Sequence, residues 1–380
     1  LPAVDKGRGA FTFLALATLL ETNVFAIAAS YGSFQDYHLA SPKSPLFGAS
    51  ASLITITGAM ITLGTYFGPF LFLSFVRAYP EYVRIFLAVS ASACSAGHLL
   101  ASIRPTPTLT LLFQGVMVGL GAGAFSTPSN FWLPQWFDER RGLATGVMYL
   151  GSGIGGVIFP FLINWLLQRV GFAWTMRVLA LILSAVGVII VLGMRPRLSP
   201  KRSVTGRRVR NESLLSLLLP HHPRIINTPL GLIHGLIQLV QAAAYWSISY
   251  YISPYATSLG MSSSTATLML ALLNVSQGIS YVIFGRMADR GHLIPVLILS
   301  STMGSILVSL LLGFSKTFGS LISFSILYGL TNGGFATLIA QQAREMAKIA
   351  EVEVTTIFVE YLGWRGTGGL IGPLICSTLY

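Results

Sequence analysis

Polar side chains recur at helical spacing in two otherwise apolar stretches in the second half of the chain. Residues 229–252 carry the first set, at positions i, i+4, i+7 and i+11: His234, Gln238, Gln241 and Tyr245. Residues 264–285 carry the second, at i, i+3 and i+7: Asn274, Gln277 and Tyr281. Each spacing places its members on one face of a helix. Their chemistry is hydrogen bonding, so the two faces either bind a polar solute or join neighbouring helices.

The chain that carries these faces has the composition of a membrane protein. Of its 380 residues, 53% are hydrophobic and 9% are charged, and the mean hydropathy is +0.71. In soluble domains about a quarter of the residues are charged. The apolar runs reach the length of about 20 residues that crosses a bilayer core. Cys94 and Cys376 lie within such runs and fit neither a disulfide framework nor a metal site.

The apolar runs predict an all-α membrane protein with two helical bundles. We expect spans near 10–32, 52–75, 83–103, 108–130, 142–166, 172–193, 229–252, 264–285, 292–313, 318–340 and 356–377. Residues 1–193 then form an N-terminal six-helix bundle, and 194–228 form a cytoplasmic basic linker. Residues 229–380 form an incomplete C-terminal bundle of about five spans.

The basic residues predict the orientation of the chain. The sequence has 24 Lys and Arg and a net charge of +12. If the N-terminus is cytoplasmic, the outer segments hold only Lys43, Arg104, Arg169 and Lys316, and nearly all other basic residues lie inside. This asymmetry is the positive-inside rule of multi-pass membrane proteins. The basic excess therefore indicates topology and excludes nucleic-acid binding.

Charged side chains within the predicted spans are candidates for function, because lipid disfavours them unless they are paired or face water. Glu21 lies deep in the first span and could carry a proton; alternatively, it hydrogen-bonds a neighbouring helix. Arg365 is either a cation in a cavity or the residue of a misplaced helix edge. Three neutral residues could line the same cavity or serve only in packing: Gln114, Tyr149 and Asn332. For the two polar faces we favour a shared wet cavity, because each holds several polar groups.

The segment after the fourth span resembles a known family signature, aromatic-Phe-x-x-Arg-Arg-x-Leu-Ala-x-Gly-x-x-x-x-Gly. The matching residues are Trp136, Phe137, Arg140, Arg141, Leu143, Ala144, Gly146 and Gly151. Asp5, Gly7 and Gly9 match a second family pattern, and Gly285, Asp289 and Arg290 match a loop pattern after the eighth span. These motifs are similar to those of the monocarboxylate porter family, in particular its fungal members, within the major facilitator superfamily.

The resemblance implies a major facilitator fold and a gating role for four charged residues at inner helix ends: Arg140, Arg141, Asp289 and Arg290. In the superfamily such charges join helix ends in one conformation and separate in the other. Gly372-Pro373 resembles a pair in the family's eleventh span, so the twelfth span is expected to be missing. Proton-coupled animal members carry substrate-binding cations where this chain has Ala28 and Tyr281. The resemblance therefore implies a neutral or amphipathic organic substrate rather than a lactate-like anion.

These observations predict a secondary active or facilitated transporter of a small organic solute, monocarboxylate-porter-like, that works by alternating access. The substrate-binding candidates are Glu21, His234, Gln238, Gln241, Tyr245, Asn274, Gln277 and Tyr281. The alternatives are efflux of a secondary metabolite or drug-like compound, and a truncated membrane protein that does not transport. No ATP-binding motif and no cluster of catalytic or metal-ligating residues occurs, so we expect neither an enzyme nor a cofactor. The expected partners are the substrate, the lipid bilayer of the plasma or vacuolar membrane and, as an open alternative, protons.

Overall fold

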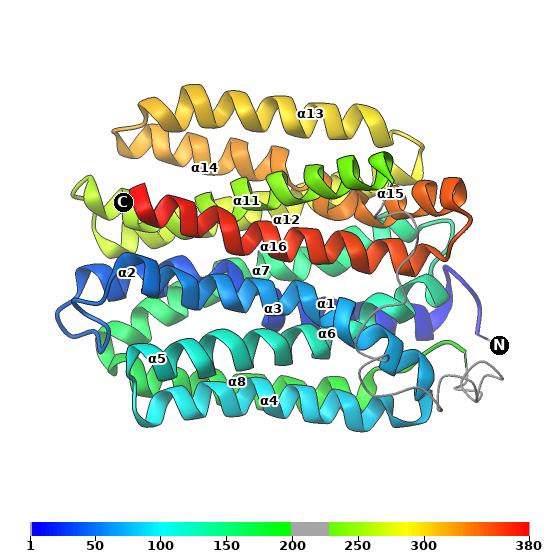
Figure 1. The fold of residues 1–380 in the computed structure, drawn as a ribbon, viewed down its shortest axis with the longest axis horizontal. Coiled ribbons are helices and arrows are strands. Elements are labelled where there is room, and N and C mark those ends of the chain that lie inside the picture. The colour runs from blue at the N-terminus through cyan, green and yellow to red at the C-terminus, as the bar shows by residue number, and fades with distance from the viewer. Residues whose placement is uncertain (1, 199–227, 380) are drawn as a thin grey trace.

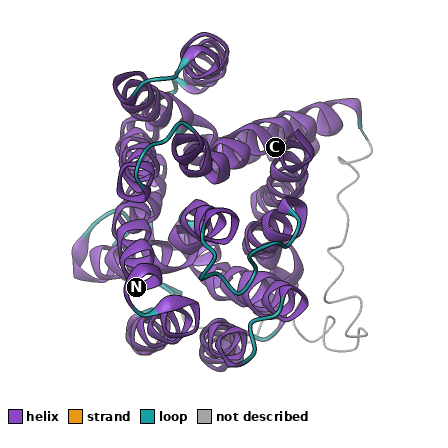
Figure 2. Cartoon of the chain, turned by 90° about the vertical axis from the view of Figure 1, so that its left-hand side faces the viewer, coloured by secondary structure: helices purple, strands orange, loops and turns teal. Residues whose placement is uncertain are grey.

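The computed structural model describes residues 2–198 and 228–379, and every regular element in these ranges is a helix (Figure 2). The first half holds α1 (Gly7–Ala29), α2 (Tyr31–Ala40), α3 (Ala51–Ala78), α4 (Val83–Ile103), α5 (Pro107–Thr110), α6 (Val118–Trp136), α7 (Arg141–Arg169) and α8 (Gly171–Gly193). The second half holds α11 (Pro229–Ser258), α12 (Ser263–Asp289), α13 (Leu293–Ile306), α14 (Phe318–Asn332), α15 (Gly334–Ala350) and α16 (Val354–Leu379). Most of the predicted linker, residues 199–227, lies outside the described residues.

The long helices agree with the predicted spans. Within the described ranges, nine helical segments are long and apolar enough to cross a membrane, six of them before residue 194. The helices α11 and α16 fall outside that hydropathy criterion but have 30 and 26 residues and run alongside the others (Figure 1). Their lower hydropathy has a physical cause, since α11 carries the first polar face and α16 carries Glu360 and Arg365.

Hydroxyl side chains cap the start of many helices. The side-chain oxygens of Ser50, Thr106, Thr228, Ser262 and Thr317 each accept a hydrogen bond from a backbone N–H of the first turn. These N–H groups have no partner inside the helix, and a cap satisfies one of them. The helix starts are therefore encoded locally in the sequence.

Two predicted spans are interrupted rather than continuous. The span near 318–340 divides at Gly333 into α14 and α15, where a Cβ on Gly333 would lie 2.0 Å from the Ser280 hydroxyl oxygen of α12. The span near 10–32 bends at Ser30, whose hydroxyl donates to the Ala26 carbonyl oxygen at 2.6 Å. Side chains that compete for the backbone, or backbones that approach closely, produce such breaks in membrane helices.

The helices form two bundles that meet along long contacts (Figure 1). Within the first half, α3 packs on α6, and α4 packs on α6 and α8; within the second, α11 packs on α16, and α12 packs on α14. The pairs α7–α12 and α3–α16 join the two halves. In Figure 1, α4 and α8 lie at one edge of the molecule and α13 and α14 at the other. The junction of the halves is therefore central.

Glycines let α7 and α12 approach at backbone distance over most of their length. A Cβ on Gly142 would lie 2.5 Å from the Gly285 carbonyl oxygen, and one on Gly146 would lie 2.3 Å from the Tyr281 carbonyl oxygen. Farther along, a Cβ on Gly153 would lie 2.7 Å from the Gly278 Cα. Small residues stabilise helix pairs in lipid because they permit such contacts. We call this interface the glycine seam.

Candidate functional site

Arg365 lies at the centre of the polar groups in the second half of the chain. It occupies the middle of α16, and only 3% of its surface is exposed. Its Nη1 donates to the Gln241 side-chain oxygen at 2.6 Å and to the Gln238 side-chain oxygen at 3.1 Å. Of the two sequence interpretations, the structure therefore supports a buried cation and not a helix edge.

The two glutamines of α11 connect Arg365 to further amides. The Gln238 side-chain nitrogen donates to the Gln342 side-chain oxygen of α15 at 2.7 Å, and the Gln241 nitrogen donates to the Asn332 oxygen of α14 at 2.8 Å. Both glutamine oxygens thus point to the cation and both nitrogens point away. We call these residues, Arg365, Gln238, Gln241, Gln342 and Asn332, the amide layer.

The remaining members of the predicted polar faces divide between two roles. The Tyr245 hydroxyl donates to the Gln277 side-chain oxygen at 2.6 Å, which links α11 to α12. The Asn274 side-chain nitrogen donates to the Gly156 carbonyl oxygen of α7 at 3.2 Å, so Asn274 is part of the glycine seam. Tyr281 is buried and faces Tyr149 of α7, with 5.9 Å between the ring centroids. These contacts join helices, within the second bundle for Tyr245 and Gln277 and between the bundles for Asn274 and Tyr281. Solute binding by these side chains stays a prediction.

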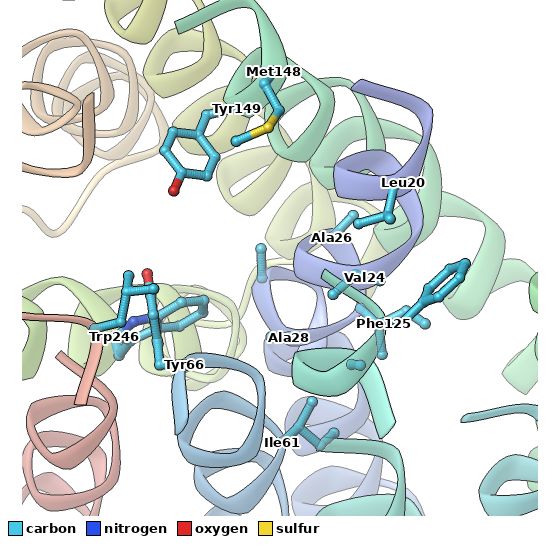
Figure 3. Close-up of a cluster of buried hydrophobic side chains, with 14 of the residues drawn as sticks. Leu20, Val24, Ala26, Ala28, Ile61, Tyr66, Phe125, Met148, Tyr149 and Trp246 are labelled. Carbon is cyan, nitrogen blue, oxygen red and sulfur yellow. The ribbon is translucent and has the colours of Figure 1, made fainter. Parts of the chain in front are cut away.

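Aromatic rings from both bundles surround the amide layer. The Arg365 guanidinium carbon lies 5.7 Å from the Tyr66 ring centroid, and Tyr66 contacts Phe25 and Trp246 edge to face at 5.1 and 6.2 Å. In Figure 3, Tyr149 of α7 points towards Tyr66 of α3 and Trp246 of α11. We call Phe25, Tyr66, Tyr149, Trp246 and Tyr281 the aromatic group; an arginine over a ring face gains cation–π stabilisation.

Glu21 is a fully buried acid on α1 of the first bundle. Neither carboxyl oxygen has a hydrogen-bond partner within the described part of the chain. Both Glu21 and Arg365 interact electrostatically with Tyr149. Glu21 of α1 and Arg365 of α16 therefore lie near the same tyrosine, on opposite sides of the junction between the bundles.

His234 and Gln114 lie apart from this arrangement. The His234 ring is half-buried and stacks on the Tyr361 ring at 6.2 Å, one helical turn from Gln238 towards the start of α11. Gln114 is buried in the π-helical segment Leu111–Met117 of the first bundle, where α3 and α4 pack on it. Neither residue forms a hydrogen bond with the amide layer among the described residues, although His234 lies on the same face of α11 as Gln238 and Gln241.

Backbone capping dominates the end of the molecule that holds Asp5, Arg141 and Asp289, which we call the inner end after the predicted orientation. The Asp289 carboxylate of α12 accepts hydrogen bonds from the backbone N–H groups of Gly142 and Leu143 at 2.6 and 2.8 Å. The Asp5 carboxylate accepts from the N–H groups of residues 138–140 at 3.2 to 3.3 Å. Asp289 therefore joins the two bundles through a helix start, where carboxylates are stabilised.

The other predicted gating charges form no ion pair among the described residues. We expected Arg140, Arg141 and Arg290 to take part with Asp289, but the ion pairs between the bundles involve other residues. Arg77 pairs with Glu353 at 2.6 Å, and Arg344 pairs with Asp138 at 3.9 Å. A cavity of about 190 Å³ beside Asp289 is lined by both basic and acidic residues, including Arg141, Arg344 and Glu345.

Neutral hydrogen bonds join the bundles at the opposite, outer end. The Tyr250 hydroxyl of α11 donates to the Gly58 carbonyl oxygen at 2.7 Å and lies 2.5 Å from the Thr62 hydroxyl, both on α3. The Tyr251 and Thr55 hydroxyls are 2.9 Å apart. These contacts, with the close approach of Gly32 to the Ser249 carbonyl oxygen, form what we call the outer seam.

Comparison with known proteins identifies the family. Residues 11–375 match the profile of the Major Facilitator Superfamily, which is nearly the whole chain. The chain belongs to this superfamily.

Similar curated members of the superfamily are fungal. An MFS-type transporter of Gibberella moniliformis is 26% identical over 322 residues, which are 84% of this chain and 73% of the relative. The aspyridones efflux protein of Emericella nidulans is 27% identical over 363 residues, 93% of this chain and 68% of the relative. An uncharacterized transporter of Saccharomyces cerevisiae is 28% identical over 362 residues, and the chain spans about half of its length.

Solved structures agree on the superfamily fold. The human organic anion transporter MFSD10 superposes with a TM-score of 0.66 at 13% identity, over 98% of this chain and 94% of that protein. A bacterial homologue of the human lysosomal transporter Spinster, in an inward-facing conformation, superposes with a TM-score of 0.60 at 14% identity, over 98% and 83%. At these identities the likeness concerns the fold alone.

The superfamily fold also brings together residues that sequence reasoning did not select. Gln342 accepts a hydrogen bond from Gln238, and the Tyr66 ring centroid lies 5.7 Å from the Arg365 guanidinium carbon. Glu360 of α16 is a further buried acid, one carboxyl oxygen of which has no partner among the described residues. Gln342 lies just beyond the predicted tenth span, which ends near residue 340, so that span did not include it. Tyr66 carried no signal, since a lone tyrosine in an apolar helix is usually a packing residue.

Proposed function

We propose that this superfamily member is a secondary transporter that moves a small organic solute through a site at the junction of its two bundles. The observation that supports the proposal best is the amide layer around Arg365, faced by the aromatic group. Polar and charged groups inside the membrane cost free energy, so their presence there points to a function. Secondary transporters bind their substrates near the midplane between two bundles. The residues contributed by α3, α7, α11 and α16 fit such a site.

The two ends of the molecule support alternating access. The capped and ion-paired inner end and the hydroxyl-bonded outer seam each join the same two bundles by a few hydrogen bonds. A few such contacts at each end give two states whose free energies differ by about a few kcal/mol, which a substrate can rebalance. We accordingly interpret Asp289 as a gating residue and propose that Arg140, Arg141 and Arg290 act with it in another conformation.

For direction, we favour efflux of a secondary metabolite over import. The support comes from relatives. The one from Emericella nidulans is named an efflux protein for aspyridones, and the one from Gibberella moniliformis is named an MFS-type transporter. Monocarboxylate-porter-like transport is the second candidate, favoured by the motif at Trp136–Gly151 and by the buried cation Arg365. In both cases Glu21 is the candidate proton carrier, because an unpartnered buried carboxyl group can bind and release a proton.

The remaining assignments complete the proposal. The chain functions as a multi-pass protein of the plasma or vacuolar membrane with a cytoplasmic N-terminus, consistent with its basic residues. Residues 1–193 and 229–380 act as the two moving bodies, joined by the linker 194–228. We propose no catalytic reaction and no cofactor, since alternating access needs only a gradient.

Reconstitution of the full chain in lipid vesicles tests the proposed function. The measurement is net uptake of a panel of labelled organic acids, aromatic alcohols and lactones, with and without an imposed proton gradient. We expect uptake of at least one class by the parent protein, a fall of about tenfold or more in Gln238→Ala, and loss of the gradient effect in Glu21→Gln. Uptake no greater than in empty vesicles across the panel would contradict a transport function.

A further inference from the structure

Arg365 is a nearly fully buried arginine with no acidic partner among the described residues. Among the described residues, Arg77 and Arg344 near the surface pair with Glu353 and Asp138, whereas no carboxylate lies within 4 Å of Arg365. A guanidinium is charged at every physiological pH. A buried charge without a counter-ion is costly, and the neutral oxygens of Gln238 and Gln241 offset only part of that cost.

The unused hydrogen-bonding capacity near Arg365 consists of donors. Four buried N–H groups have no acceptor within the part of the chain that the structure describes: Arg365 Nε, Trp246 Nε1, Asn332 Nδ2 and Gln342 Nε2. Both glutamine oxygens that could accept are already occupied by Arg365 Nη1. An unsatisfied buried donor is unfavourable until an acceptor reaches it. The group that completes this site must therefore supply acceptors, and preferably negative charge.

Glu21 does not supply that charge in this conformation. Both of its carboxyl oxygens lack partners, and no ion pair joins it to Arg365 among the described residues. The two side chains belong to different bundles, and each interacts electrostatically with Tyr149. Arg365 is instead held by amides of its own bundle, on α11. Its guanidinium thus has a fixed direction and a free edge.

The surroundings of Arg365 specify the rest of the ligand. Tyr66 lies against the guanidinium, and Trp246, Phe25 and Tyr149 continue the aromatic group across the junction of the bundles. Flat apolar molecules stack on such rings, and planar acidic groups match the two-pronged edge of a guanidinium. A small hydrophilic acid would leave the rings unused, and a neutral aromatic molecule would leave the cation unpaired.

We propose that Arg365 binds the acidic group of an amphipathic aromatic organic anion, that Gln238 and Gln241 position the guanidinium, and that Trp246 donates a second hydrogen bond to the same group. The proposal rests on the proposed transport site and defines its substrate class. The resemblance implied a neutral or amphipathic substrate, because the family's cations are absent at positions 28 and 281; the proposal keeps the amphipathic alternative and adds an acidic group to it. The cation is present in this chain on α16.

Equilibrium binding to the purified full-length protein in lipid nanodiscs tests the assignment. The probes are tritiated 2-naphthoate and its uncharged, nearly isosteric amide, 2-naphthamide, at neutral pH. The variants are Arg365→Gln and Arg365→Lys, with Arg177→Gln as the matched control, because Arg177 is a span arginine that contacts Trp174 and Ser102 at the periphery. Thermal unfolding of each variant verifies that it is folded.

We expect the parent and Arg177→Gln to bind naphthoate at least about tenfold more tightly than naphthamide. Arg365→Gln should lose that preference, and Arg365→Lys, which keeps the charge but not the planar fork, should keep part of it. Gln241→Ala should weaken naphthoate binding and leave naphthamide binding unchanged. A parent that binds neither probe, or that binds both equally, overturns the proposal, as does an unchanged preference in folded Arg365→Gln.

Vesicle uptake separates this inference from the proposed function. If naphthoate binds through Arg365 but is not taken up and no other solute is, the anion site stands and transport fails. If neutral solutes are taken up at the same rate by the parent and by Arg365→Gln, transport stands and the anion site fails. The two proposals therefore have different failing results.

Discussion

The two ends of this transporter-like molecule hold the same bundles together with different chemistry. At the outer seam, buried hydroxyl groups such as Tyr250 and Thr62 meet in a dry contact. At the inner end, exposed charged groups such as Asp138 and Arg344 meet beside a cavity that they line. Buried neutral hydrogen bonds depend on exact fit and little on salt, whereas exposed ion pairs are weak and screened. The outer end is therefore the tighter one in this conformation.

The largest effect is expected from Gly32→Leu. A Cβ at Gly32 would lie 2.9 Å from the Ser249 carbonyl oxygen, so a leucine forces the outer seam apart at a cost of about 1–3 kcal/mol. In a background without Cys94 and Cys376, a cysteine at Ser249 should react with an impermeant maleimide about tenfold faster or more. Gly319→Leu is the control, since nothing lies within 4 Å of that position. Equal rates in both variants would show that Gly32 does not close the seam.

A smaller effect at the same end is expected from Tyr250→Phe. The change removes the hydroxyl that bonds Gly58 and Thr62 and keeps the ring, at a cost of about 1–2 kcal/mol. Maleimide labelling of a cysteine at Ser249 should rise up to about tenfold. Thr62→Val added to Tyr250→Phe should cost less than the two single changes together, because they share one bond. Full additivity would mean that the two hydroxyls do not interact.

At the inner end, Asp289→Asn should open the contact between the bundles. The substitution removes the charge that caps the start of α7, worth about 0.5–2 kcal/mol. A cysteine at Ala340, which lines the inner cavity, should be labelled about threefold to tenfold faster from the inner side. Glu345→Gln is the control, because within the described ranges Glu345 forms its one ion pair with Lys348 on its own helix. Equal labelling rates in Asp289→Asn and Glu345→Gln would show that the Asp289 cap does not hold the bundles together.

The smallest effect is expected from Arg77→Gln or Glu353→Gln. This partly exposed pair is worth about 1 kcal/mol or less, so inner labelling should rise no more than about threefold. Raising the salt concentration from 0.1 to 1 M shortens the screening length from about 10 to 3 Å and should abolish the difference between parent and variants. The labelling rate at Ser249 in the outer seam should not change over the same range of salt concentration. A salt-dependent rate at Ser249 would refute the contrast between the two ends.

The helical architecture was predictable from sequence because lipid makes backbone rules strict. Each span had to be long, apolar and internally hydrogen-bonded, and most of the predicted spans agree with the long helices to within several residues. The predicted ends near 32 and 340 fall well short of the helical ends at Ala40 and Ala350. The break at Gly333 was not predicted, since it depends on Ser280 of another helix. The fold therefore followed from composition and periodicity, and its irregularities followed from tertiary contacts.

The candidate site was only partly visible in the sequence. The helical spacing of Gln238 and Gln241 correctly placed them on one face, but the spacing says nothing of what the face meets. Arg365 lies 124 residues from Gln241, and the ambiguity between a cavity cation and a helix edge could be resolved only by packing. At the inner end the sequence motif predicted that Asp289 contacts other helix ends. It could not predict that the partners of Asp289 are backbone N–H groups, because a side-chain pattern carries no information on backbone partners.

The glycine seam has a consequence for how the bundles can move. The close contacts of Gly153 with Gly278 and of Gly156 with Asn274 lie near the middle of α7 and α12, away from the Asp289 cap at the inner end. A line of contact that is closed along the middle serves poorly as a doorway. It serves better as the axis about which two rigid halves tilt, and the solute then enters and leaves past helices that lie away from that axis.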